Sequence, residues 1–203
     1  VMLSLLAKAG YQVIIPPNMA NLCCGMPWES KGFFQIADEK SDQLERVLLK
    51  ASENGKYPIL CDTSPCLYRM RRAFKSGIKL YEPVEFTHDF LLERLKLKQV
   101  PETVAVHVTC SSVKMQISDK FKTLAEACAE KVIMPDDVHC CGFAGDRGFS
   151  FPELNQSALA GLKPTLPRDC TSGYSNSRTC EIGLSLHSGI SYQSLMYLVD
   201  RVS

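Results

Sequence analysis

The chain has 203 residues, of which 45% are hydrophobic and 22% are charged, and its formal net charge is +1. This composition fits a globular protein with one large domain or two small ones, and a near-neutral chain has little electrostatic attraction for nucleic acid or an anionic membrane surface. No apolar run reaches the roughly 18 residues that cross a bilayer, so we expect no membrane-spanning segment.

In chain order, the first hundred residues alternate short apolar runs with amphipathic stretches. The run 11–15 is rich in β-branched residues and ends at Pro16, which predicts a short buried strand. Residues 41–54 repeat apolar side chains at helical spacing, which predicts a helix. Further helices are expected at 3–10, 67–76 and 87–97, and further strands at 57–60 and 78–81.

Residues 98–102 are the predicted linker, after which the same order restarts. We expect strands at 103–108 and 131–134, and helices at 117–128, 152–162 and 193–202. Strands that alternate with helices predict an α/β fold of tandem duplicated Rossmann-like parallel-sheet units, with cysteine loops at the C-terminal strand ends. The predicted domains are a first repeat at residues 1–100 and a second repeat at residues 101–203.

The two repeats share a Cys-Cys-Gly motif, at residues 23–25 and 140–142. Each motif follows an apolar, β-branched run that ends at a proline, and this doubling indicates a duplicated unit built around thiols. Cys110 lies 30 residues before Cys140, whereas the same distance before Cys23 falls outside the chain. We therefore expect the first repeat to be truncated at its N-terminus, and the chain to be a fragment of a larger protein.

Ten cysteines in a chain of this length favour a reducing compartment, because disulfide-stapled secreted domains are usually smaller and adjacent cysteines rarely bond to each other. The predicted metal ligands are Cys23, Cys24, Cys61 and Cys66 in the first repeat, and Cys110, Cys140, Cys141 and Cys180 in the second. Four soft thiolates at converging loops suit a tetrahedral zinc or an iron–sulfur cluster. Adjacent cysteines suit a multi-iron cluster better, because neighbouring thiolates can reach different irons.

Residues beside the cysteines fit the same chemistry. Gly25 and Gly142 let the backbone approach a metal closely and leave amides that can donate to sulfur. We expect four nearby cations to lower the thiol pKa values. These cations are Lys31, Arg69, Arg147 and Arg178.

Two cysteines and two histidines have other interpretations. Cys128 lies on an apolar helical stripe and is predicted to be a packed core residue, whereas Cys170 lies in a proline-flanked loop and is predicted to be a free thiol. His107 and His139 each stand near a cysteine, so a Cys–His nucleophilic pair is conceivable. A structural histidine, or a donor to sulfur, is the favoured interpretation, because His107 should face away from Cys110 along its strand.

Four runs of the sequence carry a resemblance to a known family: residues 22–33, 61–66, 139–149 and 175–184. They resemble the cysteine-rich CCG domain of heterodisulfide reductases, glycolate oxidase iron–sulfur proteins and FAD-linked D-lactate dehydrogenases. The resemblance extends over essentially the whole chain and is strongest to the C-terminal part of the FAD-linked iron–sulfur D-lactate dehydrogenases. The chain departs from the family pattern at two places, because Cys61 and Cys66 are spaced by four residues and Ser175 stands where the first repeat has Cys61.

The resemblance implies a fragment of an oxidoreductase that holds an iron–sulfur cluster, for instance of the 4Fe-4S type. Electrons would reach it from FAD, carried on another part of the parent enzyme, through ferredoxin-like domains, and would leave towards a quinone or a cytochrome. The fragment alone would be inactive towards D-lactate or another 2-hydroxy acid. The parent would be cytoplasmic, or peripheral at the inner face of the membrane. Two alternatives remain open: a zinc-stabilised structural or interaction domain, and a thiol–disulfide redox module.

Overall fold

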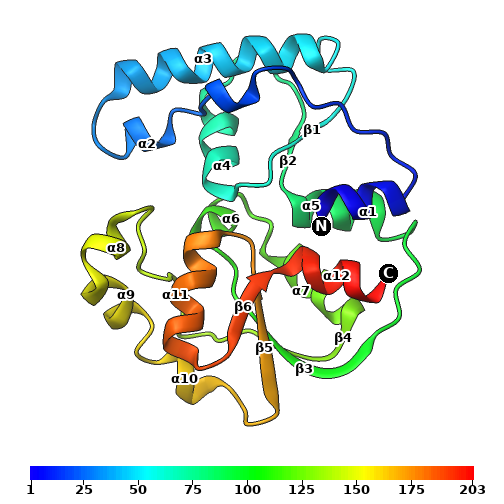
Figure 1. Ribbon diagram of the computed structural model, residues 1–203, viewed down its shortest axis with the longest axis vertical. Coiled ribbons are helices and arrows are strands. Elements are labelled where there is room, and N and C mark those ends of the chain that lie inside the picture. Colours follow the sequence, from blue (N-terminus) through cyan, green and yellow to red (C-terminus); the bar gives the residue numbers. More distant parts are fainter.

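The computed structural model describes residues 1–203, and it confirms the predicted α/β class with parallel sheets. In Figure 1 most of the first half of the chain lies above the second half, and helix α1 lies between them. The helices are α1 (Met2–Lys8), α2 (Met26–Glu29), α3 (Phe34–Ala51), α4 (Ser64–Ala73), α5 (Pro83–Phe86), α6 (Cys110–Lys114), α7 (Ser118–Cys128), α8 (Arg147–Ser150), α9 (Pro152–Ala158), α10 (Leu162–Thr165), α11 (Arg178–Ser188) and α12 (Leu195–Val202), with a 3-10 turn η1 (Met19–Asn21) and a π-helical turn η2 (Thr87–Leu91). The strands are β1 (Ile59–Leu60), β2 (Leu80–Tyr81), β3 (Val100–Val106), β4 (Ala129–Ile133), β5 (Cys170–Ser175) and β6 (Ser191–Ser194).

The second half contains a four-stranded parallel sheet in the order β4-β3-β5-β6. Its inner strands are β3 and β5, and Val104 of β3 pairs with Val132 of β4 and with Ser172 of β5. Val104 and Ala105 are fully buried, because helices cover both faces of a parallel sheet and leave its inner strands no contact with water. The first half contains a smaller sheet, in which β1 and β2 pair in parallel.

Helices α1, α5, α7 and α12 pack together where the two halves meet, at the right of Figure 1. The largest hydrophobic cluster includes Leu5 of α1, Phe121 of α7 and Leu198 of α12. Lys8 also forms an ion pair with Asp200 at 3.0 Å. The two halves therefore share one core, and a domain boundary at residue 100 stays a prediction.

Two predictions about the first hundred residues are wrong. Residues 11–15 form no strand, and Ile14 and Ile15 are 67% and 70% exposed, because no neighbouring strand pairs with them. The predicted helix at 87–97 begins earlier, at Pro83, and ends in the turn Thr87–Leu91. Glu82 caps it: its carboxylate accepts from the Val84 and Glu85 amides, and this capping box fixes the start.

The second half also departs from the expectations. The predicted linker at 98–102 is wrong in its second part, because β3 begins at Val100 and tolerates Pro101 near its start. Cys170 opens strand β5 and is buried, so it does not lie in a loop. Strands β5 and β6 are rich in Ser, Thr and Gly and lack an apolar alternation that sequence inspection could detect. No helix is both long enough and apolar enough to cross a bilayer.

Candidate functional site

The second thiol cluster, Cys110, Cys140, Cys141 and Cys180, forms at one edge of the larger sheet. Cys110 begins α6 after the three residues that follow β3, Cys140 and Cys141 lie in the loop after β4, and Cys180 lies in the first turn of α11 after β5. The carboxyl ends of parallel strands meet at the same edge of a sheet, so these separate segments converge. Cys141 Sγ lies 2.9 Å from Cys180 Sγ.

The thiols of this cluster perturb one another strongly. The pKa of Cys140 lies far below its ordinary value, because the thiols of Cys110 and then Cys141 donate to its sulfur. The pKa values of Cys110 and Cys141 are raised in turn, mainly by the same interaction with Cys140. One sulfur therefore carries negative charge that its neighbours share, which is the electrostatic state that a cation would stabilise.

The first thiol cluster, Cys23, Cys24, Cys61 and Cys66, lies in the first half and repeats the arrangement in part, with Cys66 in the first turn of a helix after a strand as Cys180 is. Cys66 lies in α4, and its thiol lowers the pKa of Cys24 to about 6 by hydrogen bonding to that sulfur. Burial raises the pKa of Cys61 to about 11. The charge of Cys23 and of Cys61 acts on Cys66, so all four sulfurs share one neighbourhood.

The two Cys-Cys-Gly turns have the same backbone construction. Gly25 and Gly142 adopt φ values of +86° and +73°, and each amide donates to the sulfur two residues before it, at 3.4 Å. A Cβ on Gly25 would lie 2.2 Å from the Ala37 carbonyl oxygen, and one on Gly142 would lie 2.4 Å from that of Leu154. Only glycine fits such a position, and the predicted amide-to-sulfur bonds are confirmed.

A buried polar side chain from a nearby helix forms a hydrogen bond to the backbone of each Cys-Cys-Gly turn. Ser41 Oγ of α3 donates to the Cys24 carbonyl at 2.7 Å. Asn155 of α9 donates through Nδ2 to the Cys141 carbonyl. Because α3 and α9 each follow their motif by a similar distance, the helix after each cysteine pair fixes the backbone that presents the sulfurs.

A buried network of hydroxyl groups joins the two thiol clusters. Ser64, which lies between Cys61 and Cys66, has its Oγ 2.5 Å from Ser111 Oγ and 3.1 Å from Ser112 Oγ, next to Cys110. The loop of the first cluster therefore touches the helix that carries a thiol of the second. Sequence inspection missed these residues, although Thr109-Cys110-Ser111-Ser112 does place three hydroxyls around one cysteine.

The network ends at a buried carboxyl group. Asn176 Nδ2 donates to Glu82 Oε1 and to Ser112 Oγ, at 2.8 Å in each case. Burial raises the pKa of Glu82 to about 7, although Asn176 and the Val84 and Glu85 amides favour its charged form. Glu82 is thus a titratable group at the junction of the two halves, and no sequence pattern distinguished it from an ordinary helix cap.

The four cations expected to lower the thiol pKa values bind elsewhere, and that prediction is wrong. Their partners are Asp146 for Lys31 at 3.8 Å, Glu29 and Asp38 for Arg69, the Ser30 carbonyl for Arg147 and Glu181 for Arg178 at 3.2 Å. Within the second thiol cluster, Lys114 lowers the pKa of Cys110. Lys114 stands four residues after that cysteine, which is one helical turn along α6.

The remaining residues considered in the sequence analysis are two histidines and Cys128. His107 is buried, its Nδ1 lies 3.3 Å from Ser175 Oγ, and burial lowers its pKa to about 4. That contact agrees with a structural histidine. Cys128 packs in the largest hydrophobic cluster, which confirms its prediction as a core residue. His139 is exposed.

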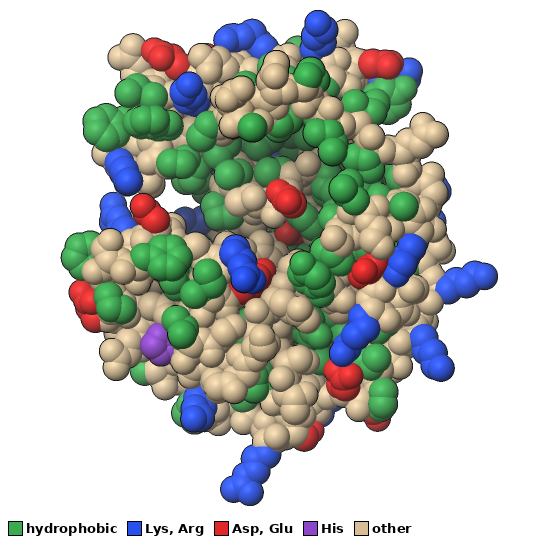
Figure 2. All heavy atoms as spheres, viewed as in Figure 1, with side chains coloured by type: hydrophobic (Ala, Val, Ile, Leu, Met, Phe, Trp, Pro, Cys, Tyr) green, Lys and Arg blue, Asp and Glu red, His purple; other side chains and the backbone are tan.

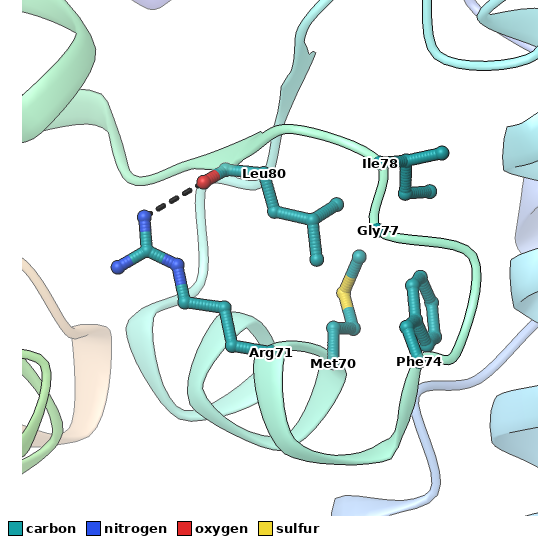
Figure 3. A pocket seen from close by; sticks show the side chains of 6 residues that line it. All are labelled: Met70, Arg71, Phe74, Gly77, Ile78 and Leu80. Carbon is teal, nitrogen blue, oxygen red and sulfur yellow. Dashed lines mark hydrogen bonds between the residues drawn. The ribbon is translucent and has the colours of Figure 1, made fainter.

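A small cavity of about 150 Å³ lies away from the thiols, between α4 and the segment that leads into β2. Its lining residues are Met70, Arg71, Phe74, Gly77, Ile78 and Leu80. Figure 3 shows Arg71 directed to the Leu80 carbonyl, to which it donates at 2.7 Å. The other side chains are apolar, so this cavity offers no group for catalysis.

The two clusters offer the sulfur donors that a thiolate-bound metal needs, but these donors are not already positioned around a metal ion. No three His, Cys, Asp or Glu side chains are arranged to hold a metal ion. Two sulfurs of one tetrahedral zinc stand about 3.8 Å apart, given Zn–S bonds of about 2.3 Å, so the Cys141–Cys180 pair would have to open. Four soft sulfurs with donating amides nonetheless form the type of ligand set that iron–sulfur clusters and zinc use.

A comparison with protein families agrees with this chemistry. The family model of a cysteine-rich domain, CCG, matches residues 104–165, a span that includes Cys110, Cys140 and Cys141. Cys180 and the first half of the chain lie outside the matched span. None of the curated proteins compared with the chain matches it. The match supports a CCG domain in the second half of the chain, a module of the metal-binding or redox type.

Proposed function

We propose that this chain is an iron–sulfur electron-transfer domain of a FAD-linked 2-hydroxy-acid dehydrogenase, such as a D-lactate dehydrogenase. One observation carries the proposal: three thiols recur at equivalent places in the two halves, Cys23, Cys24 and Cys66 in the first and Cys140, Cys141 and Cys180 in the second, each set beside a glycine amide that donates to sulfur. A purely structural role for the cysteines would not require that the same sulfur contacts occur twice.

The ligands would be Cys110, Cys140, Cys141 and Cys180 in one site, and Cys23, Cys24, Cys61 and Cys66 in the other. An iron–sulfur cluster bound there would supply one-electron transfer. The amides of Gly25 and Gly142 would stabilise negative charge on sulfur. Electrons would arrive from FAD through ferredoxin-like domains of the same enzyme and leave to a quinone or a cytochrome. The parent enzyme would act in the cytoplasm, or at the inner face of the membrane.

A second candidate is a thiol–disulfide module, and the contact between Cys141 and Cys180 favours it. Two thiol sulfurs at 2.9 Å need to close by less than one ångström to reach the roughly 2.05 Å of a disulfide. A zinc-stabilised interaction domain is the third candidate, because its ligands would be the same thiols. The three candidates differ in what the protein binds and in whether it exchanges electrons.

Anaerobic purification and reconstitution with iron and sulfide separate them. The proposal predicts bound iron and acid-labile sulfide in equal amounts, with a visible absorbance that dithionite bleaches. Colourless protein that binds stoichiometric zinc would point to the interaction domain. Colourless protein without any metal, in which Cys141 and Cys180 form a reversible disulfide, would point to the thiol–disulfide module.

A further inference from the structure

A buried polar network lies against three of the loops that present sulfurs. Ser64 belongs to the loop that carries two thiols of the first cluster, and Ser112 stands two residues after Cys110. Asn176, which donates to Ser112 Oγ at 2.8 Å, stands four residues before Cys180. Ser64 and Ser112 are fully buried, and Asn176 is 7% exposed. We call this contact region the hydroxyl network, and it consists of the side chains of Ser64, Thr109, Ser111, Ser112 and Asn176.

The hydroxyl network cannot satisfy all of its contacts at once. Five oxygen–oxygen distances among its hydroxyl groups, of 2.5–3.3 Å, lie within hydrogen-bonding range. The four hydroxyl groups supply only four protons for these five contacts. Asn176 Oδ1 is also buried without a hydrogen-bond partner. The protons therefore have more than one arrangement, and a small movement of one loop changes which buried group is left unsatisfied.

Other polar links between the halves, beside the Cys-Cys-Gly turns, lie at the surface. Lys31 forms an ion pair with Asp146 at 3.8 Å, and these side chains are 59% and 73% exposed. Arg147 donates to the Ser30 carbonyl at 3.4 Å, also in an exposed position. Figure 2 shows a hollow between the upper and lower parts at the left of the view, with charged side chains at its rim. Exposed ion pairs stabilise little, so the hydroxyl network is the stronger polar link between the thiol sites.

We propose that the hydroxyl network positions the cysteine loops of both halves and couples the two thiol sites, so that fixing the loops of one site orders the other. The proposal deepens the proposed metal-binding role and rests on it for its consequence: a metal bound at one site strengthens metal binding at the other.

The coupling follows from the segments that the hydroxyl network joins. A metal at the first site fixes the loop that carries Ser64 and so restricts the partners of Ser112. A metal at the second site opens the Cys141–Cys180 contact and sets the position of the start of α11, next to Asn176. Each metal thus orders side chains that the other site also depends on. The second metal then loses less conformational freedom on binding, which is positive coupling.

Alkylation of the metal-free full chain tests the coupling across the halves. The rate is measured at each cysteine by mass spectrometry under reducing conditions. Ser64→Ala, in the first half, should speed alkylation of buried Cys180 about fivefold or more, because the opposite loop loses a buried partner. Ser112→Ala should do the same for buried Cys24, so the test stands if one of the two variants does not fold.

The matched control is Ser188→Ala. Ser188 is 4% exposed and its hydroxyl bonds to the Ile190 backbone, outside the hydroxyl network. This variant should leave the rates at Cys180 and Cys24 unchanged. Unchanged rates in Ser64→Ala and Ser112→Ala would overturn the proposal, and so would an equal increase in Ser188→Ala, because that increase would reflect a general loss of stability.

Anaerobic titration with cobalt(II) measures the consequence for metal binding. One double variant, Cys140→Ala with Cys141→Ala, leaves the first site alone, and another, Cys23→Ala with Cys24→Ala, leaves the second. Each site should bind cobalt about fivefold more tightly, or better, when the other is intact. Adding Ser64→Ala to all three proteins should remove this ratio.

The titration separates failure of the coupling from failure of the proposed function. Cobalt bound at both sites with equal affinity in the wild type and the single-site proteins would overturn the coupling and leave the metal-binding role intact. Absence of both cobalt and iron from the wild type would refute the proposed function, and the alkylation rates would then decide the positioning role by themselves.

Discussion

Substituting Glu82 by glutamine should change how the stability of the protein depends on pH. Glu82 is fully buried, and burial raises the pKa of its carboxyl group from 4.5 to about 7. Between these two values the unfolded chain has released this proton while the folded protein still holds it. The stabilisation is therefore complete below about pH 4.5 and is lost as the pH rises through about 7.

The difference between the two pKa values sets how much the unfolding free energy changes with pH. The rise from 4.5 to about 7, at about 1.4 kcal/mol per pH unit, corresponds to about 3 kcal/mol of unfolding free energy. Glutamine is neutral at every pH and keeps an oxygen that can accept from Asn176. The free energy of unfolding of Glu82→Gln, relative to the wild type, should therefore rise by about 3 kcal/mol between pH 4.5 and 7.5.

The assay is urea unfolding under reducing, anaerobic conditions at intervals of half a pH unit. The difference between the two proteins isolates Glu82, because the other titrating groups occur in both. Glu93→Gln is the matched control for the loss of one carboxyl group, because Glu93 is exposed. A difference for Glu82→Gln that does not change with pH would refute the account of a buried, protonated carboxyl group.

Two further predictions concern packing and the cysteine turns. Leu5→Ala should lower the unfolding free energy by about 2–5 kcal/mol in a single cooperative transition, because Leu5 is fully buried in the core that the two halves share. Leu3→Ala, on the exposed side of α1, should change the unfolding free energy by no more than about 0.5 kcal/mol. A two-step unfolding transition for Leu5→Ala would contradict the shared core. Gly142→Ala should cost about 2–4 kcal/mol, since it combines a left-handed φ with a clash against a backbone carbonyl. Gly145→Ala has the same backbone strain without a clash and should cost about 1–2 kcal/mol, so equal losses in urea titrations would rule out the clash.

The fold class could be predicted because the apolar runs before each cysteine loop alternate with helical stripes. The run 103–106 becomes an inner strand, as its continuous apolar sequence requires. The similar run at 11–15 does not, because a strand exists only where another strand offers hydrogen bonds. The local sequence sets the propensity of a segment to form a strand, and the presence of a neighbouring strand decides whether it forms one.

The gathering of six of the eight thiols could also be predicted, since these six lie in a loop at a strand end or in the first turns of the following helix, whereas Cys23 and Cys24 follow a segment that forms no strand. The network of Ser64, Ser112, Asn176 and Glu82 could not, because these polar residues come from four distant segments and look like ordinary turn or capping residues. The prediction that nearby cations lower the thiol pKa values was wrong for a related reason. Proximity in sequence did not reveal that these cations instead bind carboxylates and backbone carbonyls.

The central claim is that each thiol cluster binds a metal centre, and iron analysis of two cysteine variants tests it most directly. Cys140→Ala removes the sulfur that holds negative charge in the second cluster, whereas Cys128→Ala removes a thiol from the hydrophobic core. After anaerobic reconstitution, Cys140→Ala should lose about half of the iron and labile sulfide of the wild type, and Cys128→Ala should retain all of it. Equal iron in both variants, or none in the wild type, would contradict the account.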